Sequence, residues 1–121
     1  MSVDNDAGGY QLHEVDRLIH EPARYNIMAL LYVIKRADFL FVQNQTRLTA
    51  GNLSSHLSKL ETAGYLTIQK EFVGKIPKTF LSLTDQGREA FDDYRNKMKE
   101  LFTKPPRVHK ETDRKESFNQ E

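Results

Sequence analysis

The stretch from Arg47 to Leu66 constrains the fold more than any other part of the chain, because both ends of one helix are marked in it. Thr49 is a favourable N-cap, since its hydroxyl can accept from the free backbone N–H groups of the first turn. Gly64 can take a positive φ and end the helix. Between these two residues three leucines recur at i, i+4 and i+7, which predicts one buried apolar stripe: Leu53, Leu57 and Leu60.

The opposite side of this predicted helix carries small or hydrogen-bonding residues: Gly51, Asn52, Ser54, Ser55, Ser58, Lys59 and Thr62. A surface helix usually carries carboxylates on that side, and this one has none before Glu61. The block from Phe39 to Leu60 contains Arg47 and Lys59 and no acidic residue, although the net charge of the chain is only +1. Small side chains allow close approach to another surface, and a phosphate backbone would favour this charge pattern.

Two longer helices are predicted between Tyr10 and Arg36. Apolar residues at helical spacing predict the first, from Tyr10 to His20, and Glu21-Pro22 then interrupts the pattern. Pro22 suits the first turn of a second helix that runs to about Arg36. We expect this second helix to be central, with four residues on its buried side: Ile27, Leu30, Leu31 and Ile34.

The segment from Ala37 to Thr46 has two interpretations. Phe39 to Val42 is either a short buried strand or the apolar part of a short helix. Its place directly ahead of a capped helix favours the short helix, with Thr46 to Thr49 as the connection of a helix-turn-helix.

After Gly64 the apolar period changes from that of a helix to two. The alternation predicts a strand from Tyr65 to Phe72, a turn from Val73 to Pro77 and a second strand from Lys78 to Leu83. The two strands form a β-hairpin. Thr84 then caps a final helix whose first turn holds Asp85 and whose apolar stripe has five members: Phe91, Tyr94, Met98, Leu101 and Phe102.

Length and composition limit the organisation of the chain. With 121 residues, of which 38% are hydrophobic, we expect one domain at 10–103, a disordered N-terminus at 1–9 and a disordered mixed-charge tail at 104–121. The absence of cysteine excludes disulfides and thiolate metal sites and fits a reducing compartment. No apolar run approaches the roughly 18 residues of a membrane span, and the acidic N-terminus is unlike a signal peptide. These features predict a soluble, cytoplasmic protein.

The predicted order of elements is that of an α+β, mostly helical, winged helix-turn-helix domain with a two-stranded wing and flanking N- and C-terminal helices. Two blocks, GNLSSHLSKLETAGY and FLSLTDQGREAF, are specific in combination. The chain, most densely from Pro22 to Tyr94, resembles the DNA-binding core of winged-helix transcriptional regulators of the MarR and ArsR kind. The resemblance implies a cytoplasmic, homodimeric transcription factor for double-stranded DNA. Its recognition helix, about 49–63, would lie in the major groove and its wing, about 65–83, on the flanking backbone.

The resemblance assigns base reading to the outer side of the recognition helix: Gly51, Asn52, Ser54, Ser55, Ser58 and Lys59. It assigns backbone contacts to the wing residues Lys70, Lys75 and Lys78. Arg47 and Thr49, at the N-terminal end of the helix, are further candidates for contact with the DNA backbone. The chemistry agrees, because Asn can pair with adenine edges, Ser can donate or accept, and Lys can reach guanine or phosphate.

Some of these positions have a second interpretation. The wing lysines can equally be solvated charges on edge strands. His56 can be a packed or capping histidine instead of a base reader or pH switch. The wing tip departs from the family pattern, because it holds Ile76-Pro77 where an Arg-rich tip is usual.

A dimer interface is predicted from two apolar stripes, since the distal half of the last helix has little to pack on within one chain. Its residues are Leu12, Val15, Leu18, Ile19, Phe91, Tyr94, Met98 and Leu101. The C-terminal stripe could instead belong only to the core. A twofold dimer would place two recognition helices about 34 Å apart on a pseudo-palindromic site.

Other functions find less support in the sequence. No paired carboxylates, nucleophile with a base, or phosphate-binding glycine loop is evident, so an enzyme is not expected. The four histidines (His13, His20, His56 and His109) lack metal-ligand spacing, so we expect no metal and no cofactor. A winged-helix protein-interaction module without DNA binding is the alternative function. Four aromatic residues could line a pocket for an unknown small-molecule effector or simply pack in the core: Tyr25, Tyr32, Phe39 and Phe41.

Overall fold

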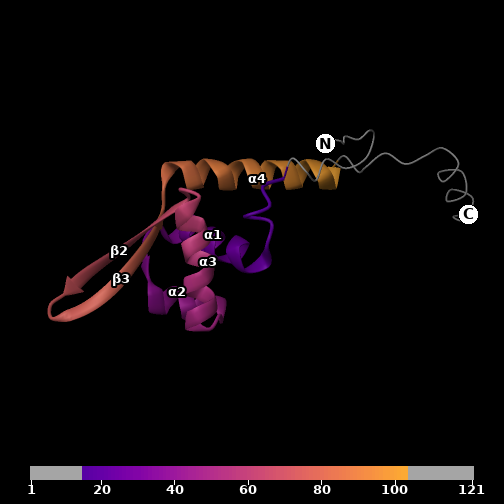
Figure 1. Cartoon of the computed structure of the whole chain (residues 1–121). Coiled ribbons are helices and arrows are strands. Elements are labelled where there is room, and N and C mark those ends of the chain that lie inside the picture. The colour runs from indigo at the N-terminus through magenta and orange to yellow at the C-terminus, as the bar shows by residue number, and fades with distance from the viewer. Residues whose placement is uncertain (1–14, 104–121) are drawn as a thin grey trace, which may run out of the picture.

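The computed structural model describes residues 15–103. Its elements, in chain order, are α1 (Pro22–Ile34), β1 (Ala37–Asp38), α2 (Phe39–Thr46), α3 (Ala50–Thr62), β2 (Leu66–Val73), β3 (Ile76–Leu83) and α4 (Asp85–Thr103). In Figure 1 the hairpin of β2 and β3 and the distal half of α4 project in opposite directions from the packed helices. The arrangement is the predicted α+β winged helix-turn-helix fold. Among the helices within 15–103, none is both long and apolar enough to cross a membrane.

Side-chain caps fix where the helices begin. In each case the residue before the helix accepts a hydrogen bond from a backbone N–H of the first turn, which has no partner within the helix. The bond from Asn52 N–H to the Thr49 hydroxyl, at 3.1 Å, confirms the predicted cap of α3. The equivalent bond from Gly87 N–H to Thr84 is 2.9 Å long and confirms the predicted cap of α4.

The connection between α2 and α3 is a tight turn. Arg47 caps the C-terminus of α2 with φ 63° and ψ 20°, a left-handed conformation, and its N–H donates to the carbonyl of Gln43. The short helix at Phe39–Thr46 and this turn confirm the predicted helix-turn-helix. After α3, Gly64 takes φ 84° and turns the chain into β2, as predicted.

The wing belongs to a three-stranded sheet with the order β1-β3-β2, although the sequence predicts only two strands. Ala37 lies opposite Leu81 and Asp38 opposite Phe80. A strand of two residues is too short to show a period of two, so its sequence carries no such signal. The predicted turn from Val73 to Pro77 is also wrong in length, because Val73 pairs with Ile76 and only Gly74 and Lys75 form the turn.

One core lies between the helices and the base of the sheet. Its buried hydrophobic residues are Val15, Ile19, Ile27, Met28, Leu31, Ala37, Val42, Leu53, Leu57, Leu60, Leu66, Leu81, Phe91 and Tyr94. The leucine stripe of α3 is buried as predicted. On α1 the prediction is partly wrong, because Ile34 is exposed at the end of the helix and Met28 is fully buried instead.

The predicted first helix is wrong where the structure describes it. Residues 15–20 form turns, in which a carboxylate oxygen of Asp16 accepts from the backbone N–H groups of Leu18 and Ile19. Asp side chains compete with helical hydrogen bonding in this way, so an apolar stripe alone was not sufficient. The remainder of that helix, and the predicted ends at 1–9 and 104–121, lie outside the described residues.

Candidate nucleic-acid interface

The outer face of α3 is fully accessible. All six predicted base-reading residues are exposed: Gly51, Asn52, Ser54, Ser55, Ser58 and Lys59. None of the polar side chains in this set makes a hydrogen bond or ion pair with another residue of 15–103. Unpaired donors and acceptors on a rigid helix are available to base edges. The face therefore carries the hydrogen-bonding groups that base reading requires.

Gly51 has no side chain, so the helix backbone is accessible at the N-terminal end of this face. A Cβ built at Gly51 has no heavy atom within 4 Å apart from its own chain neighbours and helix backbone. Packing within the described residues therefore does not require glycine at this position. A requirement from outside the protein, such as close approach of DNA, would explain the glycine.

Arg24 of α1 connects three segments around the recognition helix. Its guanidinium donates to Nδ1 of His56 at 3.1 Å and, through Nε, to the carbonyl of Leu18 at 2.7 Å. The nearest Glu21 oxygen is 3.9 Å from the same Nδ1, too far for a hydrogen bond. The His56 side chain is only 19% exposed. This geometry supports the packed interpretation of His56 and assigns Arg24 a role in orienting α3 that the sequence did not predict.

The predicted backbone-contact residues differ in their surroundings. Arg47 is exposed at the turn before α3, and Thr49 uses its hydroxyl as the helix cap. Lys70 and Lys75 are exposed on the wing. Lys78 is half-buried and lies 3.4 Å from a carboxylate oxygen of Asp38. Lys78 therefore has an acidic partner, whereas the other two wing lysines have none among residues 15–103.

Asp38 joins α2 to the wing. Its carboxylate accepts from the backbone N–H of Phe41 at 2.8 Å, and this bond, more than the nearby Lys78, holds the pKa of Asp38 below its ordinary value. The ionised form is thus the one that the fold favours. Asp38 is a cap that also anchors strand β3 through Lys78.

Arg36 packs against the outer face of the wing. Its guanidinium lies 3.9 Å from the centre of the Phe80 ring, and one of its nitrogens is 2.6 Å from an oxygen of Glu71. Both members of the ion pair are nearly half exposed, so the pair itself contributes little stability. The stacked contact joins the end of α1 to the hairpin, and no local pattern around Arg36 predicted it.

A second long-range contact joins the segment before α1 to the start of β2. The Tyr65 hydroxyl donates to a carboxylate oxygen of Asp16 at 2.5 Å. Partial burial and this hydrogen bond raise the pKa of Tyr65 to about 12. The bond attaches residues 15–20 to the strand that leads into the wing.

The predicted dimer residues fall into three groups. Leu12 lies outside the described residues. Four others are buried in the core of a single copy: Val15, Ile19, Phe91 and Tyr94, of which Tyr94 also lines a hollow beside α4. Only Leu18, Met98 and Leu101 are partly buried at its edge. An apolar stripe does not reveal which of its members the same chain covers, so the assignment of these four core residues to a dimer interface stays a prediction.

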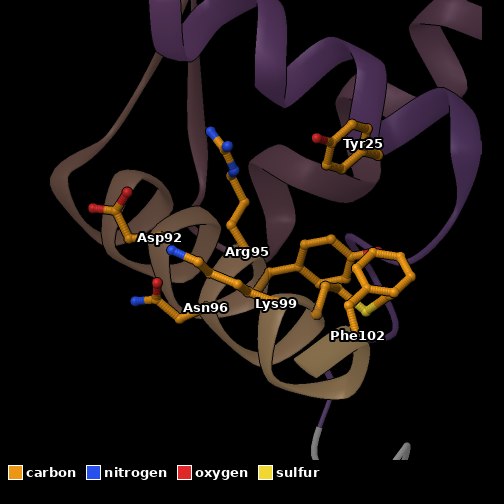
Figure 2. A pocket seen from close by; sticks show the side chains of 8 residues that line it. Tyr25, Asp92, Arg95, Asn96, Lys99 and Phe102 are labelled. Atoms are coloured by element: carbon orange, nitrogen blue, oxygen red, sulfur yellow. The ribbon is translucent and has the colours of Figure 1, made fainter. Parts of the chain in front are cut away.

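Phe102, near the end of α4, was not predicted as a site residue and is 83% exposed. It borders a hollow of about 580 Å³ between α1 and the distal half of α4. Figure 2 shows Tyr25 of α1 on one side of this hollow and Asp92, Arg95, Asn96, Lys99 and Phe102 of α4 on the other. Of the four aromatic residues considered for a pocket, Tyr25 alone lines this one. Tyr32 instead packs on Phe91, with 5.2 Å between the ring centres.

Comparison with known proteins agrees with this geometry. Residues 23–102 match the family described as winged helix DNA-binding domain. An uncharacterized protein of Methanocaldococcus jannaschii is 35% identical over 78 residues, which cover 64% of this chain and 85% of that protein. These matches confirm the predicted resemblance to winged-helix proteins.

Two solved structures show the same fold. A transcriptional regulator homologue from Pyrococcus horikoshii OT3 superposes with a TM-score of 0.69 at 30% identity, covering 73% of this chain and 87% of that one. NadR in complex with 4-hydroxyphenylacetate has a TM-score of 0.60 at 18% identity, covering 85% of this chain and 82% of that one. The second likeness supports the fold alone.

Proposed function

The chain belongs to the winged helix DNA-binding domain family, and from that premise we propose that it is a homodimeric regulator of transcription that reads duplex DNA with α3. The recognition helix enters the major groove, and the lysines of the wing contact the flanking backbone. DNA binding is the activity that the family's description names. The dimer, the groove and the residues are our proposal.

The observation that carries the proposal is the outer face of α3. It is exposed, small, polar and free of internal hydrogen bonds, and Lys59 is its one charge before Glu61. A groove about 12 Å wide admits such a helix closely. An interface for another protein would be expected to show apolar anchors on this face, and it has none between Gly51 and Lys59 outside the buried leucines.

A second copy is proposed to pack against the distal half of α4. Phe102 is exposed there, Met98 and Leu101 are only partly covered, and the hollow beside Tyr25 leaves room for a side chain. Large exposed aromatic residues beside a hollow are typical anchors of protein interfaces. Pairing at this end leaves both recognition helices free, and we propose that they lie about 34 Å apart on the DNA.

The proposal is tested by selecting bound sequences from random duplex DNA and then comparing variants on the selected duplex. Asn52→Ala and Ser55→Ala should each cost about 1–3 kcal/mol on that duplex and relax the preference at one or two positions. Lys75→Ala should weaken binding to the selected and to a scrambled duplex by the same factor, because phosphate contacts do not depend on sequence.

Glu89→Ala, an exposed position on α4, is the matched control and should leave both affinities unchanged. If Asn52→Ala and Lys75→Ala have the same effect on both duplexes, the assignment of base readers is wrong. If selection enriches no sequence, sequence-specific binding is refuted.

A further inference from the structure

The end of the wing is apolar on both of its faces. Phe72 is 74% exposed, Val73 50% and Ile76 60%. Phe72 lies opposite Pro77, and Val73 lies opposite Ile76. Directly opposed residues of an antiparallel pair share a face, so one apolar pair lies on each side of the hairpin. Exposed edge strands usually carry charges instead, which makes this tip unusual.

No described part of the chain covers this tip. At the base of the hairpin, Leu66, Ile68 and Leu81 face the core. Along the same face Lys70 is already exposed, and Phe72 lies one step further out. Figure 1 shows the hairpin continuing well beyond the packed helices. Packing within residues 15–103 therefore does not account for these apolar side chains.

The charges around the tip favour an anionic partner. Lys75 is in the turn itself, and Lys70 is two residues before Phe72 on the same face. Neither lysine has an ion-pair partner among the described residues. The one acidic residue of the outer hairpin, Glu71, is paired with Arg36 at 2.6 Å. The tip thus presents unpaired cations beside bare apolar groups.

Duplex DNA fits both properties, because phosphates line its surface and stacked bases form its interior. The tip also lies on the polypeptide that continues directly from the recognition helix, since β2 begins four residues after α3 ends. When α3 occupies a major groove, the hairpin is carried to the adjacent part of the same duplex.

We propose that the wing tip is an apolar wedge that enters the minor groove beside the recognition site and partly unstacks a base step, bending the DNA. This inference rests on the proposed function. Phe72 and Ile76 supply the wedge, and Lys70 and Lys75 contact the phosphates on either side. The minor groove is about 6 Å wide. Two strands alone are about 4.8 Å apart, so entry of the tip with its side chains requires the groove to widen. Proteins that insert apolar side chains in this way bend the duplex by about 20–90° toward the major groove.

The test uses the full chain and the duplex recovered by selection. Each end of the duplex carries a fluorophore, and 2-aminopurine replaces one base at a time at successive positions beyond the half-sites. Wild type should bend the duplex by about 20° or more, seen as a shorter end-to-end distance. It should also raise the 2-aminopurine fluorescence at one flanking step. The variant F72S/I76S should bind the same sequence with both signals lost. Both positions are exposed, so its thermal stability should match wild type within a few degrees.

Lys75→Ala is the matched control at the same tip, because it removes a charge and leaves the wedge. It should lower affinity and keep the bend. The wedge is overturned if the duplex stays straight when wild type binds it, or if F72S/I76S still bends it. Either result leaves the proposed function intact. Failure to bind any duplex overturns both. A third outcome is that the bound duplex stays straight, and that wild type binds phosphatidylserine vesicles whereas F72S/I76S does not. This outcome assigns the tip to a lipid surface and overturns the proposal.

Discussion

Replacing Gly51 with alanine separates the demands of folding from those of DNA binding. Gly51 is in the first turn of α3, and a Cβ there has no neighbouring heavy atom within 4 Å among residues 15–103, apart from its chain neighbours and its own helix backbone. Gly is about 1 kcal/mol less favourable than Ala inside a helix, and near the N-terminus we take roughly half of that value. The free protein should therefore gain about 0.5 kcal/mol, which raises Tm by about 2–4 °C.

DNA affinity should change in the opposite direction. If the helix backbone approaches the groove at Gly51, the added methyl group must be accommodated at a packed interface, which costs about 1–3 kcal/mol. That free energy corresponds to a Kd raised roughly 5- to 150-fold. A variant that is more stable and binds less tightly cannot be explained by damage to the fold.

The assay is thermal unfolding of the free protein together with fluorescence anisotropy on the selected duplex. Asn26→Ala is the matched control, because Asn26 is exposed on α1 and also gains helix propensity. It should raise Tm to a similar extent and leave Kd unchanged. An unchanged or lower Kd for Gly51→Ala would refute close approach at this end of α3.

Three further predictions concern the packing of α4 against the start of β2, the bond between Tyr65 and Asp16, and the proposed dimer interface. Gly87→Ala places a Cβ 2.0 Å from the backbone carbonyl oxygen of Tyr65, so we expect a loss of about 3 kcal/mol and a Tm lower by about 12–24 °C in a thermal melt; an unchanged Tm would contradict this contact. The raised pKa of Tyr65, about 12 against 10 in the unfolded chain, contributes stability that is complete below pH 10 and is lost as pH rises through 12. Denaturant titrations should thus show a steeper decline between pH 10 and 12 for wild type than for Tyr65→Phe, and equal slopes would count against the bond to Asp16. Phe102→Asp should convert the proposed dimer to a monomer in light scattering without lowering Tm of the monomer, whereas an unchanged mass would exclude this face of α4 as the interface.

The predictable parts of the fold are those with local signals. The caps Thr49 and Thr84 and the leucine stripe of α3 act within a few residues, and the structure has each where the sequence predicts it. The alternation after Gly64 likewise predicted the wing. Where a local signal misled, as at residues 15–20, a competing local interaction of Asp16 had been overlooked.

The less predictable parts depend on residues that are distant in sequence. Arg24 and His56 are 32 positions apart, and Asp16 and Tyr65 are 49 apart. No spacing rule connects such residues, so the contacts that orient α3 and hold the start of β2 could be seen only in the folded chain. The stripe on α4 shows the same limit, because the burial of Phe91 and Tyr94 depends on what packs over them.

The residues of the candidate site were easier to predict than the long-range contacts that hold α3 and the wing in place. Exposure of the outer face of α3 follows from the leucine stripe on the other side, since a helix has only one buried face here. The sequence left two interpretations of the wing lysines, DNA contacts or solvated charges. Lys78 has an acidic partner from β1, a strand that the sequence did not reveal, whereas Lys70 and Lys75 have none in the part of the chain that the structure describes.

The most direct test of DNA reading by α3 is the salt dependence of Kd, measured from 50 to 200 mM on the selected duplex and on a scrambled duplex. We predict a log–log slope of about −0.9 for each phosphate neutralised on both duplexes, with the selected duplex bound at least about 1000-fold more tightly. Asn52→Ala should reduce the ratio between the two duplexes and leave the slope unchanged. Flat salt dependence, or equal affinity for the two duplexes throughout the series, would contradict the proposal that this helix reads DNA sequence.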